Sequence, residues 1–240
     1  MKKMVDHEHI LGAEEAHDGW GAKLREIILG GQDGLVNVLG IVLGVAAATA
    51  STRIVLISGL AATFAESISM GAVAYTSTKA AKEYYLSLRR KERSELKTKP
   101  REERREVRDI YYHKGFRGQL LNQIVNRITS SKRVWLDTML AEELHVFPEE
   151  YHDPLRSGFI VGIASIFGSL IPLLPFFFLP VMPSVWWALL ICTLSLFIVG
   201  AIKAKITVGV WWKSGFELAA IGMAAAITGY AVGLVLGVTI

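Results

Sequence analysis

The chain lacks the residues on which several common functions depend. It has one cysteine, Cys192, so no disulfide can form within it. It contains no HExxH metalloprotease motif, no GxSxG nucleophile motif and no Walker-type phosphate loop. Hydrolase and nucleotide-driven pump functions therefore have no residues to carry them. Charge is also absent over long stretches, since residues 157–202 contain no Asp, Glu, Lys or Arg.

The charged residues that are present are crowded into three regions. Of 240 residues, 52% are hydrophobic and only 20% are charged. Apart from Arg53 and Glu66, the charges fall within residues 1–33, 79–156 and 203–217, and apolar runs separate these regions. This distribution is typical of an integral membrane protein with one polar insertion, and it excludes a soluble globular domain with a large core.

The apolar runs predict five membrane-spanning helices. A helix needs about 20 apolar residues to cross a bilayer. We expect the first two spans at residues 27–50 and 54–78, two more within 157–202, and the fifth at 218–240. The break within 157–202 is expected at a cluster of four prolines, followed by a Trp pair at the membrane interface. These residues are Pro172, Pro175, Pro180, Pro183, Trp186 and Trp187.

The polar parts predict the remaining organisation. Residues 1–26 are expected to form a cytosolic amphipathic segment, without the apolar core of a cleavable signal peptide. The second span is expected to continue as one long helix to about Leu96. Further helices are expected at 101–113, 119–130 and 134–145, which together make 79–156 a helical domain between the second and third spans. Residues 157–240 hold the last three spans.

Basic residues predict which side of the membrane the polar domain occupies. Residues 79–114 contain thirteen Lys or Arg and seven Asp or Glu. A basic excess beside a span marks the cytosolic side. The same charge suits contact with anionic lipid, and no nucleic-acid partner is expected.

Glu66 is the only charged side chain in the second span. An acidic residue at mid-helix costs roughly 2.5 to 3.5 kcal/mol in insertion assays, so such residues usually face water, an ion or a partner. Ser69 and Met70 share its helix face, and the three donors together suit a transition-metal cation. The alternative is a protonated Glu66 that is hydrogen-bonded inside a helix bundle.

Glycines shape the first and fifth spans. Asp33 lies in Gly30-Gly31-Gln32-Asp33-Gly34, which should permit close backbone approach and depart from ideal helix. Asp33 is either an interfacial helix cap or the mouth of an ion path. Glycines four residues apart, as in Gly40 and Gly44, fit close helix contacts within or between chains. Five spans leave little room for a path inside one protomer, so a pathway at a two-fold interface is attractive.

The polar domain contains acids at helical spacing. Such pairs put two ligands on one helix face, and three faces turned inward would form a carboxylate-rich, thioether-flanked site for Fe²⁺ or a similar ion. The alternative is a solvated face, because arginines interleave with the acids. The candidate metal ligands are Glu92, Glu95, Glu103, Glu106, Met139 and Glu143.

Three Glu-x-x-His sequences begin at Glu14, Glu142 and Glu149. This spacing serves di-iron sites in helical bundles. Only the middle one lies in a clear predicted helix. The Glu-x-x-His spacing leaves open a second function, that of a membrane-anchored ferroxidase or metal sensor.

Four motifs give the chain a family resemblance. They are Gly31-Gln32-Asp33-Gly34-Leu35, Ile68-Ser69-Met70-Gly71, Trp135-Leu136-Asp137-x-Met139 and Leu170-Ile171-Pro172-Leu173. The chain resembles the vacuolar iron transporter family. This implies an all-α membrane protein of five transmembrane helices, with a cytosolic helical metal-binding domain between helices 2 and 3 and a homodimeric arrangement. It further implies proton-coupled export of Fe²⁺, and often Mn²⁺, through a path at the dimer interface.

The resemblance also assigns residues. Asp33 and Met70 match the family's intramembrane pathway, and the six candidate ligands match its cytosolic metal site. Two positions depart from the plant-like pattern: Leu140 replaces a second thioether, and Ala62 replaces an intramembrane Glu. We expect Glu66, one turn on, to take over that role, so that Asp33, Glu66 and Met70 form the pathway.

The remaining expectations concern ligands and location. No obligatory cofactor is expected, and the bound or transported ion is Fe²⁺ or another divalent ion such as Mn²⁺, Co²⁺ or Zn²⁺. The partners are a second copy of the chain, protons and the lipid bilayer. The absence of a targeting segment favours a prokaryotic cell membrane, and the vacuolar membrane is the eukaryotic alternative.

Overall fold

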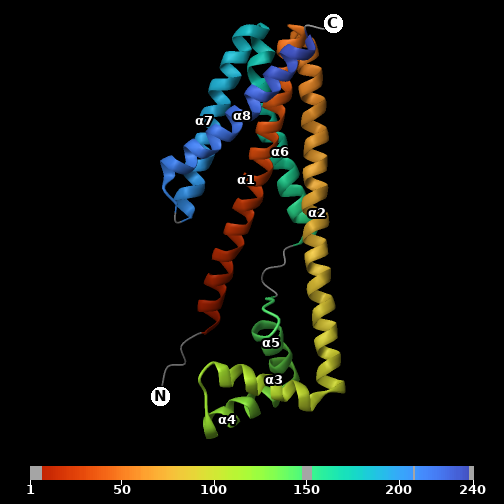
Figure 1. Ribbon diagram of the computed structural model, residues 1–240, viewed down its shortest axis with the longest axis vertical. Helices are drawn as coiled ribbons and strands as arrows, with labels where there is room; N and C mark the ends of the chain where they lie inside the picture. Colours follow the sequence, from red (N-terminus) through yellow and green to blue (C-terminus); the bar gives the residue numbers. More distant parts are fainter. Residues whose placement is uncertain (1–6, 148–152, 208, 238–240) are drawn as a thin grey trace. The chain divides into compact units, whose positions relative to one another are not determined.

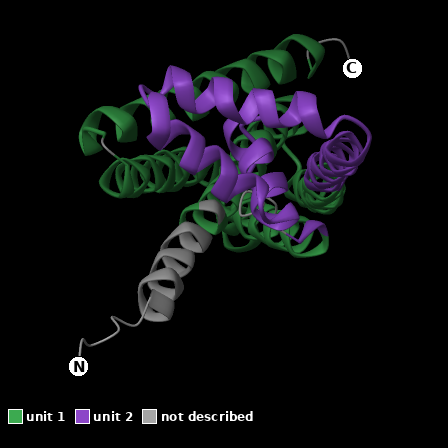
Figure 2. Ribbon diagram, turned by 90° about the horizontal axis from the view of Figure 1, so that it is seen from below, with its two compact units in different colours: residues 1–75, 155–240 green, residues 76–154 purple. Residues whose placement is uncertain are grey.

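The computed structural model describes residues 7–147, 153–207 and 209–237, with side chains from Gly21 onward except at Ala22. These residues form eight helices and no strand. The chain divides into two compact units, residues 1–75 with 155–240 and residues 76–154 (Figure 2). We call them unit 1 and unit 2 and treat each by itself.

Within the described part of the chain, five helices are long and apolar enough to cross a membrane, as the sequence predicts. They are α1 (His7–Thr49), α2 (Thr52–Thr98), α6 (Pro154–Phe178), α7 (Val181–Ile206) and α8 (Trp211–Gly237) (Figure 1). In α1 the apolar span begins at Lys23. Residues 7–26 of the expected cytosolic amphipathic segment belong to α1, which is continuous from His7, and the amphipathic character of the segment stays a prediction. Residues 1–6 lie outside the described part.

The turns between these helices follow from local chemistry. Ala50 has a φ of 48°, which ends α1 and lets α2 begin two residues later. The break between α6 and α7 falls at Leu179 and Pro180, inside the predicted proline cluster. Pro172 and Pro175 nevertheless lie inside α6. Helix interiors in membranes tolerate proline because neighbouring groups satisfy the freed carbonyls.

The core of unit 1 joins α1 to α6, α7 and α8. Its apolar cluster includes Val38 and Leu39 from α1, Phe176 from α6 and Leu196 from α7. Helix α8 packs along α1 and α7 (Figure 1). The structure confirms that the glycine spacings mark close helix contacts, here within one chain. A Cβ built on Gly233 would lie 2.0 Å from the carbonyl oxygen of Gly44.

The glycine-rich stretch around Asp33 corrects one expectation. Residues 30–34 are regular α-helix within α1, so the predicted departure from helical geometry is wrong. The predicted close approach is present. A Cβ on Gly30 would lie 2.3 Å from the carbonyl oxygen of Val161 on α6. These glycines therefore serve helix packing, and the helix needs no irregularity to accommodate them.

Unit 2 contains the end of α2 and three short helices. These are α3 (Pro100–His113), α4 (Gly118–Thr129) and α5 (Lys132–Glu142). The predicted turn between α3 and α4 is confirmed, with φ angles of 99° at Gly115 and 57° at Gly118 that favour glycine. Two apolar clusters hold the unit together. One surrounds Val107, Val125 and Met139, and the other contains Tyr85, Leu136 and Leu140.

Candidate functional site

The end of α2 positions the first candidate ligand. Pro100 cannot continue a helix from the residues before it, so α2 ends at Thr98 and α3 starts at Pro100. The chain turns at Lys99, between α2 and α3. Glu92 lies about two turns before this break, and its side chain is buried, with 4% of its surface exposed.

Glu103 enters the site because α3 is strongly amphipathic. Glu103 and Val107 are its buried residues and lie one turn apart on the same face. Val107 packs in the apolar cluster with Trp135 and Met139. This packing turns Glu103 inward, with 5% of its surface exposed.

Glu143 lies at the end of α5. Ser131 caps the start of that helix by accepting a hydrogen bond from the backbone N–H of Val134. Glu143 is the residue that follows the last helical position, and its own N–H donates to the carbonyl oxygen of Met139. Its side chain is more exposed than those of Glu92 and Glu103.

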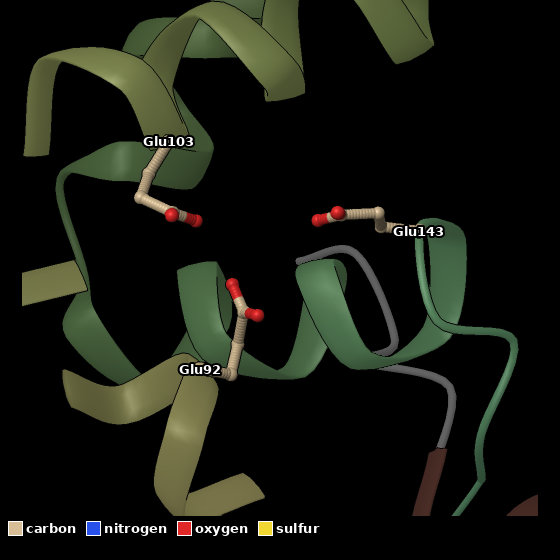
Figure 3. Close-up of side chains that lie close together, drawn as sticks. All are labelled: Glu92, Glu103 and Glu143. Carbon is tan, nitrogen blue, oxygen red and sulfur yellow. The ribbon is translucent and has the colours of Figure 1, made fainter. Parts of the chain in front are cut away.

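The three carboxylates converge on one point. One oxygen of each of Glu92, Glu103 and Glu143 lies within 4.8 Å of the others, and Figure 3 shows the three side chains pointing toward a common centre. Oε1 of Glu92 and Oε2 of Glu103 are buried without a hydrogen-bond partner. Buried carboxylate oxygens are normally paired, because unpaired burial costs several kcal/mol. The site therefore calls for a proton or a cation between these oxygens.

The electrostatics of the site also indicate that it holds a proton or a cation. Burial raises the pKa of Glu103 from 4.5 to about 8, and the adjacent Glu92 carboxyl and the charges of Glu106 and Glu95 add to this rise. Burial also raises the pKa of Glu143, with smaller contributions from Glu106 and Glu103. Excess negative charge in a desolvated place produces both shifts.

The structure locates the other predicted ligands of unit 2. Glu95 and Glu106 are half-buried and act on the pKa of Glu103 and Glu143 through their charge. Met139 is fully buried in the apolar cluster with Val107 and Trp135. Its role as a ligand stays a prediction.

The Glu-x-x-His sequence that begins at Glu142 does not have the geometry of a metal motif. Helix α5 ends at Glu142, and His145 has a φ of 54°, so this Glu-x-x-His sequence does not lie on one helix face. The Glu142 carboxylate instead pairs with Lys114. The sequences at Glu14 and Glu149 lie at least partly outside the described side chains. A di-iron site built from Glu-x-x-His sequences therefore has no support within the described residues.

A second polar group lies in unit 1, between α1 and α2. The Nδ2 amide of Asn37 donates to Oε1 of Glu66 at 2.9 Å. Asp33 is close enough to Glu66 for their carboxyls to interact. Met70 follows Glu66 by one turn on α2 and is half-buried. The structure thus brings Asp33 and Glu66 together, and their role in a transport path stays a prediction.

Asn37 is a residue that the sequence analysis missed. It lies one turn after Asp33 and shares its helix face, so the i, i+4 spacing on the first span was the available signal. An amide in an apolar span is less conspicuous than a carboxylate. Its partner could be found only once α1 and α2 were placed side by side.

Comparison with known proteins gives the chain its relatives. The model of the VIT family matches residues 24–234. "Vacuolar iron transporter 1" of Arabidopsis thaliana is 32% identical over 228 residues, covering 95% of this chain and 89% of that protein. The protein of the same name from Eucalyptus grandis is 33% identical and covers 90% of this chain and 88% of its own.

A more distant organism provides a further relative. "Vacuolar iron transporter" of Plasmodium berghei (strain Anka) is 30% identical over 217 residues, covering 86% of this chain and 80% of that protein. The matched range includes residues of both units. Since the family model covers all but the ends of the chain, this protein belongs to the VIT family.

Proposed function

We propose that this protein is a transporter, not an enzyme, and that it moves divalent transition metal across a membrane, with Fe²⁺ as the main substrate and Mn²⁺ as a second one. Its relatives are named as iron transporters. The observation that carries the proposal is the convergence of Glu92, Glu103 and Glu143 with two unpartnered buried oxygens. Hard oxygen ligands with excess negative charge suit a small divalent cation.

The proposed direction is export from the cytosol. The basic excess in residues 79–114 favours a cytosolic unit 2 by the positive-inside rule. A carboxylate site on the cytosolic side would bind metal ions in the compartment from which they are exported. The proposed membrane is the cell membrane in a prokaryote and the vacuolar membrane in a eukaryote.

The proposed path leads from unit 2 to the polar group of unit 1. There Asp33, Glu66 and Met70 would bind the metal in transit, with two carboxylates and a thioether as ligands. Protons from the far side would then displace the metal from these carboxylates. Proton antiport follows because a carboxylate cannot hold a proton and a metal ion at the same position.

The exposed face of α1 and α2 supports a homodimer. Asp33, Glu66 and Met70 are only half-buried in one copy, and Asn37 is exposed. Polar groups that face hydrocarbon are costly, so this face needs a cover. A second copy related by two-fold symmetry would cover it and would place the path between the protomers.

The test is Fe²⁺ flux into proteoliposomes under an imposed pH gradient. The wild-type protein is compared with Glu66→Gln and with Glu83→Gln, a control on the same helix whose partner, Lys79, is exposed. Wild-type and Glu83→Gln flux should follow the gradient, and Glu66→Gln flux should be lost. Metal binding without any flux from folded protein would favour the sensor or ferroxidase instead. Flux that ignores the gradient would remove the antiport step.

A further inference from the structure

A large cavity in unit 2 is separate from the carboxylate site. Its volume is about 910 Å³, and it lies between the end of α2 and α5. This is within the range of cavities that hold small ligands. The metal proposal makes no use of it.

The walls of this cavity are strongly basic. Five cationic side chains and one acidic side chain line it, and they are Arg89, Arg93, Lys97, Lys132, Arg133 and Asp137. Asp137 pairs with Arg133 at 3.8 Å. The other four cations have no ion-pair or hydrogen-bond partner among the described residues. The cavity thus carries an uncompensated positive charge.

All five cations are exposed to solvent, but they are clustered along two helices. Arg89, Arg93 and Lys97 follow one another at four-residue spacing on α2, so they form a single row. Like charges at this spacing repel. Lys132 and Arg133, at the start of α5, face the same cavity. A bound anion between the two helices would turn this repulsion into attraction.

The floor of the cavity is apolar. Tyr85, Leu136 and Leu140 form one of the two hydrophobic clusters of unit 2, and Phe147 also lines the cavity. A cationic rim over an apolar floor fits a ligand with an anionic end and an apolar part. Arginine side chains bind phosphate groups well, because the planar guanidinium fork matches the phosphate oxygens.

We propose that this cavity binds a phosphate group attached to an apolar or aromatic moiety. Two sources share this chemistry: a soluble phosphate ester and the headgroup of an anionic phospholipid. Arg89, Arg93 and Lys132 hold the phosphate, and the floor around Tyr85 and Leu140 holds the apolar part. Binding joins α2 to α5 and stabilises unit 2.

The experiment uses the full chain in nanodiscs. ATP is the soluble probe, titrated calorimetrically in phosphatidylcholine nanodiscs without divalent metal. The lipid probe is phosphatidylglycerol, offered in an equal mixture with phosphatidylcholine and counted by native mass spectrometry. The pocket variant is Arg93→Gln with Lys132→Gln. The matched control is Arg90→Gln with Arg127→Gln, which removes two exposed cations of the same unit outside the cavity.

The expected result is saturable binding of one probe that weakens at least tenfold in the pocket variant and less than twofold in the control. Binding of ATP identifies a soluble ligand, and selective retention of phosphatidylglycerol identifies a lipid headgroup. The proposal is overturned if neither probe binds, or if both variants lose binding equally, because the effect is then diffuse charge.

A measurement on the wild-type chain guards against misfolded variants. An amine-reactive reagent is applied with and without the bound probe, and the modified lysines are identified by mass spectrometry. The probe should slow modification of Lys97 and Lys132 and leave Lys91 unchanged, since Lys91 lies on α2 outside the cavity. The proposal is contradicted if the probe has the same effect on the modification rate of all three lysines.

Discussion

The amide of Asn37 on α1 donates to the Glu66 carboxylate on α2 at 2.9 Å. This hydrogen bond links the first two membrane helices at the point where the only carboxylate of the second apolar span, residues 54–78, enters. It fixes the direction of a side chain that could otherwise adopt several rotamers. Asn37 is therefore a positioning residue for Glu66 in the proposed path.

Replacing Asn37 by Ala should lower Fe²⁺ flux about tenfold, because a hydrogen bond to a charged group contributes about 1.5 to 3 kcal/mol. The measurement is initial flux into proteoliposomes at matched protein density. Thr228→Ala is the control, since Thr228 bonds only to Ala224 within its own helix. If the Asn37→Ala variant has the same flux as the wild-type protein, Glu66 does not need this hydrogen bond to hold its position.

Replacing Glu103 by Gln should weaken metal binding at least tenfold. The substitution keeps the shape of the side chain but removes one of the three carboxylates whose oxygens converge, so that only Glu92 and Glu143 remain in that group. Mn²⁺ is a convenient probe because it resists oxidation, and calorimetry on the detergent-solubilised chain gives its affinity.

The neighbouring residue provides the control for this substitution. Glu102 lies on the same helix, is exposed and pairs with Lys99 at 3.5 Å. Glu102→Gln removes the same formal charge outside the site and should change Mn²⁺ affinity less than twofold. A similar loss in both variants would mean that the overall charge of unit 2, and not the converging group, attracts the metal.

The raised pKa of Glu103 predicts how pH acts on the metal-free protein. Its pKa is about 8 in the folded chain against 4.5 as an ordinary Glu, so the folded state binds this proton more tightly. The resulting stabilisation is complete below pH 4.5 and is lost as the pH rises through 8. The Glu103→Gln variant has no titrating carboxyl at this position, so it lacks this pH dependence.

This dependence is measured as the melting temperature of wild-type and Glu103→Gln protein from pH 5 to 8.5, with metal removed. The wild-type value should fall relative to the variant across this range. Comparison with the variant cancels the titration of distant groups and leaves that of Glu103 with its effect on the neighbouring Glu92 and Glu143 carboxyls. Parallel curves would show that Glu103 titrates at its usual pKa and that its carboxyl is better solvated than the structure indicates.

The sequence predicted the elements better than their contacts. The five spans and the long α2 helix were predictable because runs such as residues 54–78 can satisfy their backbone in lipid only as helices. The proline break and the turn at Gly115 were predictable because these residues restrict or extend the available backbone angles. The family resemblance also came from motifs that lie in these elements.

The sites were predictable only in part. Spacing alone could suggest Glu92 and Glu103, but not that both would be buried together, since that depends on the turn at Lys99 and on the packing of Val107. The helical spacing of Glu142 and His145 was misleading because α5 ends between them. The pairing of Asn37 with Glu66 could not be predicted because the two residues lie on different helices.

The glycine contact between α1 and α8 gives a prediction about stability. A Cβ on Gly233 would lie 2.0 Å from the Gly44 carbonyl oxygen, so Gly233→Ala must push the two helices apart. We expect a loss of about 1 to 3 kcal/mol of unfolding free energy, as for other overpacked contacts. Circular dichroism during denaturation by detergent provides the measurement.

Gly21→Ala is the matched control for this contact. It makes the same chemical change in a helix, but a Cβ on Gly21 meets nothing within 4 Å. Alanine favours the helix over glycine by up to about 1 kcal/mol, so Gly21→Ala should be neutral or stabilising. Opposite signs for the two variants would assign the loss at Gly233 to helix packing. Equal and neutral effects would mean that α8 can move away from α1 without cost.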